Sequence, residues 1–370
     1  MKTIAKSILT AIVATSVAAC GASSAVDENA QTGSAAEALT GPNGQGFFGS
    51  DTMRDAIVSA VAASPAAGSL TYLGTGSGNG EKCLRGKPVG IYCNGSKDQS
   101  ITPMSRDLKG CEAGEKSHRV ALDGIGIWSS SGQSVTDISL ANVRNAFCGT
   151  DGSGSTAACS VTNWSQIGGA NATIVAYRRD DASGTTDTFK SILGEKGAAC
   201  NAFCGSVKVV VERASGPALS TDPDGTSSLQ APNGPCAPTD SATDCIGKLS
   251  AGSSNVLAYA GLGAGTVSPA PKAIKVAGKE PSLANIRALV SDPANAYPFA
   301  RFLYLNENTA NSRALAETKF FKWAFGQAPY GSDATALTFE SKLTDAGFIS
   351  CTDQSDPDHV ALECGAGACN

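Results

Sequence analysis

Short apolar runs alternate along this chain with longer segments in which apolar residues recur every three or four positions. The short runs are typical of buried strands, and the longer spacing is typical of helices. The predicted strands lie at 69–73, 99–106, 120–128, 173–176, 207–212, 256–260 and 302–305. The predicted helices lie at 49–61, with Ser50 or Asp51 as the expected N-cap, and at 139–147, 186–193, 282–290, 312–325 and 339–346. Strands that alternate with helices predict an α/β fold.

The segment 176–189 contains the main candidate for a binding site. Its predicted strand ends in two arginines and two aspartates, and Ser183, Gly184 and Thr185 follow at the predicted start of a helix. A helix N-terminus presents unpaired backbone N–H groups and the positive end of the helix dipole. Arginine adds a charged fork that pairs with two oxyanion oxygens, and hydroxyl groups add neutral donors. The segment therefore predicts a site for a small oxyanion.

Arg179 is the predicted cationic ligand of this site. The alternative is a surface salt bridge with Asp180 or Asp181, which would contribute little free energy. The spacing between Arg179 and Ser183 favours a ligand, although Arg178 could be the arginine that pairs with an aspartate. We expect Asp181 to pair with Arg179 and to orient it.

The glycine-rich run 74–80 follows the first predicted strand. A dinucleotide-binding loop would have its third glycine where Asn79 stands, and a phosphate-binding Walker loop would continue with Lys and Ser or Thr. Neither pattern is met. We expect a loop that donates the Ser77 hydroxyl and backbone N–H groups to an anion. A plain turn beside a disulfide is the alternative.

Composition and charge narrow the class of protein. The chain has 370 residues, of which 42% are hydrophobic and 16% charged, so a globular fold with a sizeable core is expected. The net charge is −5 and there is no basic run, which argues against nucleic acid as a partner. Any anion site must therefore act through local donors.

The N-terminus is typical of an exported protein. Two lysines precede a short apolar run, and small residues lead to Cys20, so residues 1–20 read as a signal peptide. The sequence before Cys20 resembles a bacterial lipobox, which makes Cys20 the predicted site of lipidation. An ordinary signal peptide is the alternative. Residues 21–43 are rich in Ala, Ser and Gly and predict a flexible tether, with the fold starting near residue 44.

The cysteine count agrees with export. There are 13 cysteines, and without Cys20 an even 12 remain that can all pair in an oxidising compartment. Zinc is a weaker explanation, because there are two histidines and no C-x-x-C. The loop-rich stretch 213–256 is expected to be closed by one of these disulfides. The pairs suggested by spacing are Cys83–Cys93, Cys148–Cys159, Cys200–Cys204, Cys236–Cys245, and Cys351 with Cys364 or Cys369.

Four candidate loops occur in an order that resembles a known family. They are 49–53, 74–78, 102–109 and 179–185, and later segments at 257–262 and 297–304 continue the resemblance. Together they resemble the periplasmic phosphate-binding proteins of ABC transporters, the PstS-like, type II periplasmic binding proteins. The resemblance implies two α/β lobes, each a mixed sheet flanked by helices, joined by a two-strand hinge. Lobe 1 would comprise 44–119 and 257–370, and lobe 2 would comprise 120–256.

The resemblance also implies a ligand set. Lobe 1 would donate from Thr52, the Met53 amide and Ser77. Lobe 2 would donate from Arg179 and the segment Ser183, Gly184 and Thr185. These donors would replace the hydration shell of an anion enclosed between the lobes.

The third loop departs from the family pattern. Typical members have an aspartate there, which accepts the proton of phosphate and rejects sulfate. This chain has Ser105 and Arg106 at that place. Either Arg106 contacts the anion as a second cation, or Asp51 or Asp107 accepts the proton.

The implied function is capture of inorganic phosphate outside the cytoplasm and its delivery to an ABC transporter permease. Such a receptor would be a monomer in the bacterial periplasm or on the outer surface, anchored through Cys20, with no cofactor, metal or catalysis. The alternatives are a secreted phosphatase or hydrolase, a receptor for another tetrahedral oxyanion, or an adhesion protein with a reused fold. A hydrolase is disfavoured, because no G-x-S-x-G occurs and neither His118 nor His359 lies in a catalytic motif.

Overall fold

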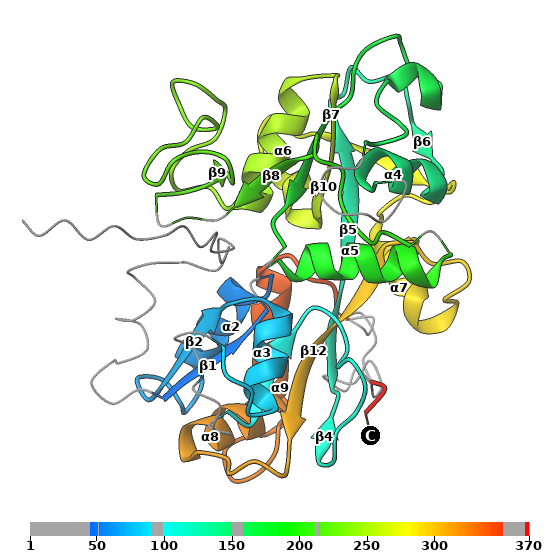
Figure 1. Cartoon of the computed structure of the whole chain (residues 1–370). Coiled ribbons are helices and arrows are strands. Elements are labelled where there is room, and N and C mark those ends of the chain that lie inside the picture. Colours follow the sequence, from blue (N-terminus) through cyan, green and yellow to red (C-terminus); the bar gives the residue numbers. More distant parts are fainter. Residues whose placement is uncertain are drawn as a thin grey trace, which may run out of the picture. The chain divides into compact units, whose positions relative to one another are not determined.

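The computed structural model describes residues 45–50, 52–89, 93, 99–149, 158–181, 183–197, 199–211, 213, 215–350 and 367–369 (Figure 1). Its strands are β1 (Gln45–Gly49), β2 (Leu70–Gly74), β3 (Ile101–Met104), β4 (Glu115–Lys116), β5 (Arg119–Ser129), β6 (Asp137–Ile138), β7 (Val175–Arg179), β8 (Lys208–Val211), β9 (Ala218–Leu219), β10 (Val256–Gly261), β11 (Lys272–Val276) and β12 (Ala300–Asn308).

Helices flank these strands, as the α/β prediction requires. The α-helices are α2 (Arg54–Ala63), α3 (Ser77–Leu84), α4 (Leu140–Phe147), α5 (Gly184–Glu195), α6 (Ala242–Gly252), α7 (Leu283–Ser291), α8 (Leu315–Ala324) and α9 (Asp333–Asp345). Two 3₁₀ turns, η1 (Trp164–Ile167) and η2 (Leu262–Thr266), complete the described elements.

The main sheet is mixed. Its strand order is β3-β12-β5-β10-β7-β8-β9, and β1 pairs with β2 in a separate parallel sheet. β5 runs antiparallel to both β12 and β10, whereas β10, β7 and β8 are parallel to one another. The antiparallel and parallel parts therefore meet at β10, which pairs antiparallel with β5 and parallel with β7.

Two strands, β5 and β12, contribute to two separate hydrophobic cores. In β5, Ala121 packs into a core with Phe47 and Phe320, whereas Leu122 packs into the core of Phe189 and Tyr259. In β12, Ala300 belongs to the second core and Leu303 to the first. The two strands run side by side in Figure 1. They are therefore the part of the sheet that passes from one core to the other.

Several predicted elements are confirmed, and others need correction. The helices predicted at 139–147 and 282–290 coincide with α4 and α7 to within a residue. The strand predicted at 173–176 lies two residues further on, because its arginines pair with β8. The strands β1 and β11 were not predicted, and the last helix begins at Asp333 rather than near 339.

Two segments predicted as loops contain helices. The run 74–80 turns into α3 at Ser77, after Gly76 adopts a positive φ of 92° at the N-cap. The two glycines inside α3, Gly78 and Gly80, hide the helix in the sequence, and burial of Cys83 and Leu84 compensates for their low helix propensity. The stretch 213–256 contains α6, which begins with a capping box between Ser241 and Asp244.

The predicted cap of α2 is wrong. The N-cap position is occupied by Met53, whose side chain makes no capping hydrogen bond. Ser50 is held further back, because its N–H donates to Pro103 and its carbonyl accepts from the Tyr72 hydroxyl. Asp51 lies outside the described residues.

The observed disulfides include both pairs that are close in the sequence and pairs that only the fold brings together. Cys83–Cys93 and Cys236–Cys245 are confirmed. The pairs Cys148–Cys159 and Cys200–Cys204 are wrong. A backbone bridge between Cys148 and Phe203 places the segment of Cys148 beside the segment that contains Cys200 and Cys204, so the disulfides form between the segments and not within them. The observed bonds are Cys148–Cys200, Cys159–Cys204 and Cys111–Cys369.

Cys369 is thus not the partner of Cys351, and the remaining option, Cys351–Cys364, lies outside the described residues. The predicted signal peptide, Cys20 and the tether lie outside them as well. In the described part of the chain, every helix is too short or too polar to cross a membrane.

Candidate functional site

The first turn of α5 is built from the residues predicted to bind an oxyanion. Ser183 is the N-cap, and its Oγ accepts a hydrogen bond from the Thr185 N–H at 3.2 Å. The Ser183 N–H donates to Asp180 Oδ1 at 3.0 Å, which holds the preceding turn. Ser183, Gly184 and Thr185 are buried. The positive end of a 12-residue helix therefore lies in a largely water-excluded setting.

Aromatic packing fixes α5 on the sheet. Phe189 stacks on Tyr259 of β10 with ring centroids 4.0 Å apart, and Thr186 Oγ1 lies 2.9 Å from the Tyr259 hydroxyl. Burial raises the pKa of Tyr259, so its phenol stays neutral. Thr186 Oγ1 also donates to the Arg179 carbonyl, which ties the helix to the end of β7. We call Arg179 together with Ser183, Gly184 and Thr185 the helix side of the site.

Three hydroxyl groups from other elements form a second group. Ser77 begins α3, and its Oγ accepts a hydrogen bond from the Ser105 N–H at 3.0 Å. The two serine hydroxyls are 3.1 Å apart, and both side chains are fully buried. Thr52 lies just before α2. We call Thr52, Ser77 and Ser105 the hydroxyl side.

The two sides are in contact. Thr52 Oγ1 lies 3.3 Å from Thr185 Oγ1, and Thr188 of α5 donates to the Ser105 carbonyl at 3.0 Å. A Cβ added to Gly184 would lie 1.9 Å from Ser105 Oγ and 3.0 Å from Ser77 Oγ. Only glycine permits this approach. In Figure 1, α5 lies beside one end of α3, in agreement with these contacts.

Met53 is placed differently from the hydroxyl residues. Its side chain is fully buried in the core that contains Phe47 and Ile57. At the N-cap of α2, its backbone amide belongs to the first N–H groups of the helix. The position agrees with a role for the amide and not for the side chain.

Two hydroxyl groups that sequence reasoning missed lie at the ends of β1 and β2. Ser50 Oγ and Thr75 Oγ1 are buried and have no hydrogen-bond partner among the described residues. Both residues directly follow the register pair Gly49 and Gly74. The carboxyl ends of parallel strands are the usual place for ligands in α/β proteins. The sequence marked Ser50 only as a helix cap.

Arg179 is buried at the end of β7. One of its Nη atoms donates to Thr243 Oγ1 of α6 at 2.9 Å, and the other lies 3.9 Å from Asp180 Oδ2. The expectation that Asp181 pairs with Arg179 is wrong, and the alternative that Arg178 is the pairing arginine is confirmed. Successive residues of a strand point to opposite faces, so the two arginines have different partners.

Arg178 binds Asp181 and packs on Phe203. Its guanidinium donates to both carboxylate oxygens of Asp181, at 3.1 and 2.9 Å, and lies 4.0 Å from the Phe203 ring centre. Burial alone would raise the pKa of Asp181. The hydrogen bonds and charges of Arg178 and Lys190 outweigh burial, so this pKa lies below its usual value.

Arg106 is neither exposed nor unpaired. It donates to Glu81 at 2.7 Å and to the Asp107 carbonyl at 2.8 Å, and its Nε lies 3.6 Å from Asp187 of α5. Its charge is therefore compensated by buried Glu81. The Asp107 carboxylate accepts from Leu108, Ser117 and Ala368, so it is engaged in holding the loop.

Arg301 of β12 is a further residue that no sequence motif marked as functional. Its guanidinium donates to the Gly184 carbonyl at 3.2 Å and to Thr185 Oγ1 at 3.3 Å. The contact joins positions 116 residues apart, which explains why local spacing could not reveal it.

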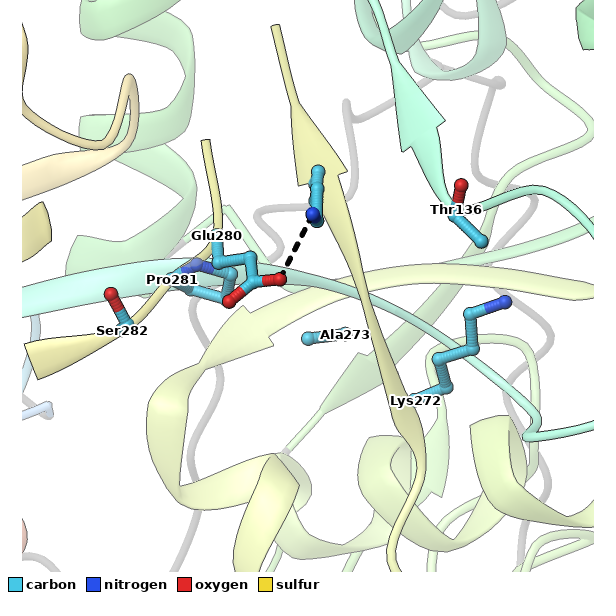
Figure 2. A pocket seen from close by; sticks show the side chains of 7 residues that line it. Thr136, Lys272, Ala273, Glu280, Pro281 and Ser282 are labelled. Carbon is cyan, nitrogen blue, oxygen red and sulfur yellow. Dashed lines mark ion pairs between the residues drawn. The ribbon is translucent and has the colours of Figure 1, made fainter. Parts of the chain in front are cut away.

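Other features of the surface are separate from this site. A shallow pocket is lined by Thr136, Lys272, Ala273, Lys275, Glu280, Pro281 and Ser282, none of which was predicted to bind a ligand (Figure 2). Its one ion pair, Lys275–Glu280, is exposed and therefore weak. His118 bonds to Glu307 at 3.0 Å and packs on Phe325, away from any catalytic grouping. Within the described residues, no cluster of three His, Cys, Asp or Glu side chains could hold a metal ion.

A family model described as the PBP superfamily domain matches residues 49–327. The chain belongs to the PBP superfamily. The match spans both sides of the site and both strands that pass between the cores. The chain accordingly has the two-lobed α/β fold of the superfamily.

Solved structures of the PBP superfamily resemble the chain over most of its length. An ABC-type phosphate transport receptor from Vibrio cholerae is 16% identical, with a TM-score of 0.55 and coverage of 83% of this chain and 99% of the receptor. A phosphate ABC transporter substrate-binding protein with bound phosphate from Clostridium perfringens is 20% identical, with a TM-score of 0.52 and coverage of 84% and 100%. PstS from Borrelia burgdorferi is 18% identical, with a TM-score of 0.50 and coverage of 84% and 100%. Curated protein sequences yield no match.

Proposed function

We propose that the protein is an extracytoplasmic receptor that captures inorganic phosphate and hands it to an ABC transporter permease. The observation that carries the proposal is the buried contact between the helix side and the hydroxyl side, at the N-terminus of α5. Preset neutral donors and a helix dipole replace the hydration shell of an oxyanion without a large net charge. The phosphate receptors of V. cholerae and C. perfringens have the same fold, which supports this choice of ligand.

The proposed ligands are the donors of the two sides. Thr52, the Met53 amide, Ser77 and Ser105 would donate from the hydroxyl side. Arg179, the Ser183 hydroxyl, and the amides and hydroxyl of Gly184 and Thr185 would donate from the helix side. The unpartnered Ser50 and Thr75 hydroxyls are additional candidates, because a buried hydroxyl without a partner is costly.

We assign Arg106 to the frame of the site. Its bond to Glu81 leaves no uncompensated charge for a second cationic ligand. The Ser105 hydroxyl can accept as well as donate a hydrogen bond, so it can accept the hydrogen bond of the protonated phosphate oxygen in place of the aspartate typical of the family. Asp51 is the other candidate acceptor.

The lobe boundaries remain a proposal. Core membership supports lobe 1 from about residue 45 to 121, since Val120 and Ala121 pack with Phe47. Tyr259, Ile274 and Phe299 pack with the other core, so we move the end of lobe 2 from 256 to about 300. β5 and β12 would then be the two-strand hinge.

We further propose that residues 1–20 direct export, that Cys20 carries a lipid, and that 21–43 tether a monomeric domain to the cell envelope. A permease would then be the partner at the membrane. Such a receptor binds and releases its ligand and catalyses no reaction.

Calorimetric titration of the purified domain tests the function. Phosphate should bind saturably at one site, and sulfate should bind more weakly, at pH values above and below the second ionisation of phosphate. If sulfate binds more tightly than phosphate, the protein is still a receptor, but its ligand is a different oxyanion. Absence of heat and of a shift in Tm with either anion would overturn the proposed function.

A further inference from the structure

A buried ion pair lies where β5 and β12 pass from one core to the other. Arg301 of β12 and Asp123 of β5 are register partners, and they are only 4% and 3% exposed. Arg301 Nε and Nη2 both donate to Asp123 Oδ2, at 2.9 and 2.5 Å. The carboxylate therefore compensates the buried guanidinium and fixes its orientation.

All five N–H groups of Arg301 have protein acceptors. Besides the two bonds to Asp123, Nη2 donates to Thr185 Oγ1 at 3.3 Å, and Nη1 donates to the Gly184 carbonyl at 3.2 Å and to Thr188 Oγ1 at 3.1 Å. A guanidinium has five donors and no acceptor, so these contacts use its full capacity. Arg301 therefore acts on the helix side and leaves the ligand to other residues.

The two threonine contacts determine where hydroxyl protons point. A hydroxyl that accepts a bond from Arg301 still has one proton to donate. The single proton of the Thr188 hydroxyl has two carbonyl acceptors within reach, Ser105 at 3.0 Å and Gly184 at 2.8 Å, and it can serve one of them or be shared between them. Thr185 Oγ1 lies 3.3 Å from Thr52 Oγ1, and either atom can be the donor of this pair. With Arg301 as a hydrogen-bond donor to its oxygen, the Thr185 hydroxyl is free to donate toward the hydroxyl side, where the proposed anion binds.

We propose that Arg301 is a positioning residue of the anion site. It orients the Thr185 hydroxyl as a donor to the bound oxyanion and holds the first turn of α5 against Ser105. Asp123 fixes Arg301 in the geometry that both tasks need. The inference rests on the proposed function, because it names a residue that shapes the same site.

A double-mutant cycle with inorganic phosphate tests this role. We expect Arg301→Met and Thr185→Val each to weaken phosphate binding by about tenfold or more in calorimetric titration. The double variant should be little weaker than either single variant, because both changes remove the same oriented donor. Arg301→Lys, which retains the charge but has three donors, should lie between wild type and Arg301→Met.

Arg313→Met is the matched control. Arg313 pairs with buried Glu307 of β12 and lies away from both sides of the site. Its loss should lower Tm and leave the Kd for phosphate within twofold. Thermal unfolding of every variant without phosphate separates lost stability from lost affinity.

Three outcomes would overturn the inference. The first is an unchanged Kd in Arg301→Met while wild type binds phosphate, and the second is a double variant whose loss equals the product of the single losses. In either case the proposed function stands. The third is failure of wild type to bind phosphate, which removes the proposed function as well. If Arg301→Met does not fold, Arg301→Lys with and without Thr185→Val completes the same cycle.

Discussion

The helix side and the hydroxyl side are in contact, but they differ in the charge that they carry. The helix side carries the dipole of α5 and the buried guanidinium of Arg179. The hydroxyl side has neutral side chains, and its neighbouring cation, Arg106, is neutralised by Glu81. In the proposed site, attraction for an anion would therefore come from the helix side, through the dipole of α5 and Arg179, whereas the hydroxyl side would provide directed neutral donors.

This division has a physical advantage in a protein of net charge −5. A guanidinium buried on the hydroxyl side without a counter-charge would be costly, and it would bind any anion regardless of shape. Hydroxyl groups in fixed positions discriminate by geometry instead. The comparison predicts that changes on the helix side affect affinity most and that changes to the ion pair between the sides affect it least.

Replacement of Arg179 by Ala should have the largest effect. Loss of a buried cation beside the anion should weaken phosphate binding by about 100-fold or more, in calorimetric titration. Arg178→Met is the control, because Arg178 binds Asp181 and packs on Phe203. Arg178→Met should lower Tm, but it should change the Kd for phosphate far less than Arg179→Ala does. Equal losses of affinity in the two variants would contradict the assignment of Arg179 as the ligand.

Gly184→Ala should have the second-largest effect on phosphate affinity, because it separates the two sides without removing a hydrogen-bond donor. The new Cβ would lie 1.9 Å from Ser105 Oγ, so α5 or the Ser105 loop must shift. We expect affinity to fall by about tenfold, in line with the usual cost of overpacking of about 1–3 kcal/mol. The measurement is phosphate titration together with the Tm of the free protein.

Gly194→Ala, in the same helix, is the matched control for this change. Apart from the backbone of α5 itself, no heavy atom of the described residues lies within 4 Å of a Cβ at Gly194, so the variant should keep its affinity and gain up to about 1 kcal/mol of stability. A Gly184→Ala protein with wild-type affinity would show that close contact between the sides is unnecessary.

Asp187→Asn should have the smallest effect. Asp187 of α5 lies 3.6 Å from Arg106, and its side chain is 31% exposed, so the pair contributes on the order of 0.2–1 kcal/mol. We expect the affinity for phosphate to change by no more than about threefold in a titration at low salt, and the change to disappear at high salt. Asp333→Asn controls for loss of an acid from the first turn of a helix. A loss of phosphate affinity above tenfold in Asp187→Asn would contradict this ranking, because it would show that the Arg106–Asp187 pair dominates the electrostatics of the site.

The sequence by itself determined the class of fold and the helix start that contains Ser183, Gly184 and Thr185. Alternating apolar runs and helical spacing predicted most strands and helices, because backbone conformation and burial of one face depend on near neighbours. The N-cap at Ser183, with Gly184 and Thr185 behind it, depends on residues within one turn. Such local patterns can be read without knowledge of the rest of the chain.

Tertiary structure decided everything that depends on distant partners. Spacing could not separate Arg178 from Arg179, because strand direction and neighbours assign their faces. Packing alone put Ser77 into a helix and crossed the disulfides of Cys148 and Cys159. The contact between Arg301 and Thr185 Oγ1 joins residues 116 positions apart, so it too exists only in the folded chain.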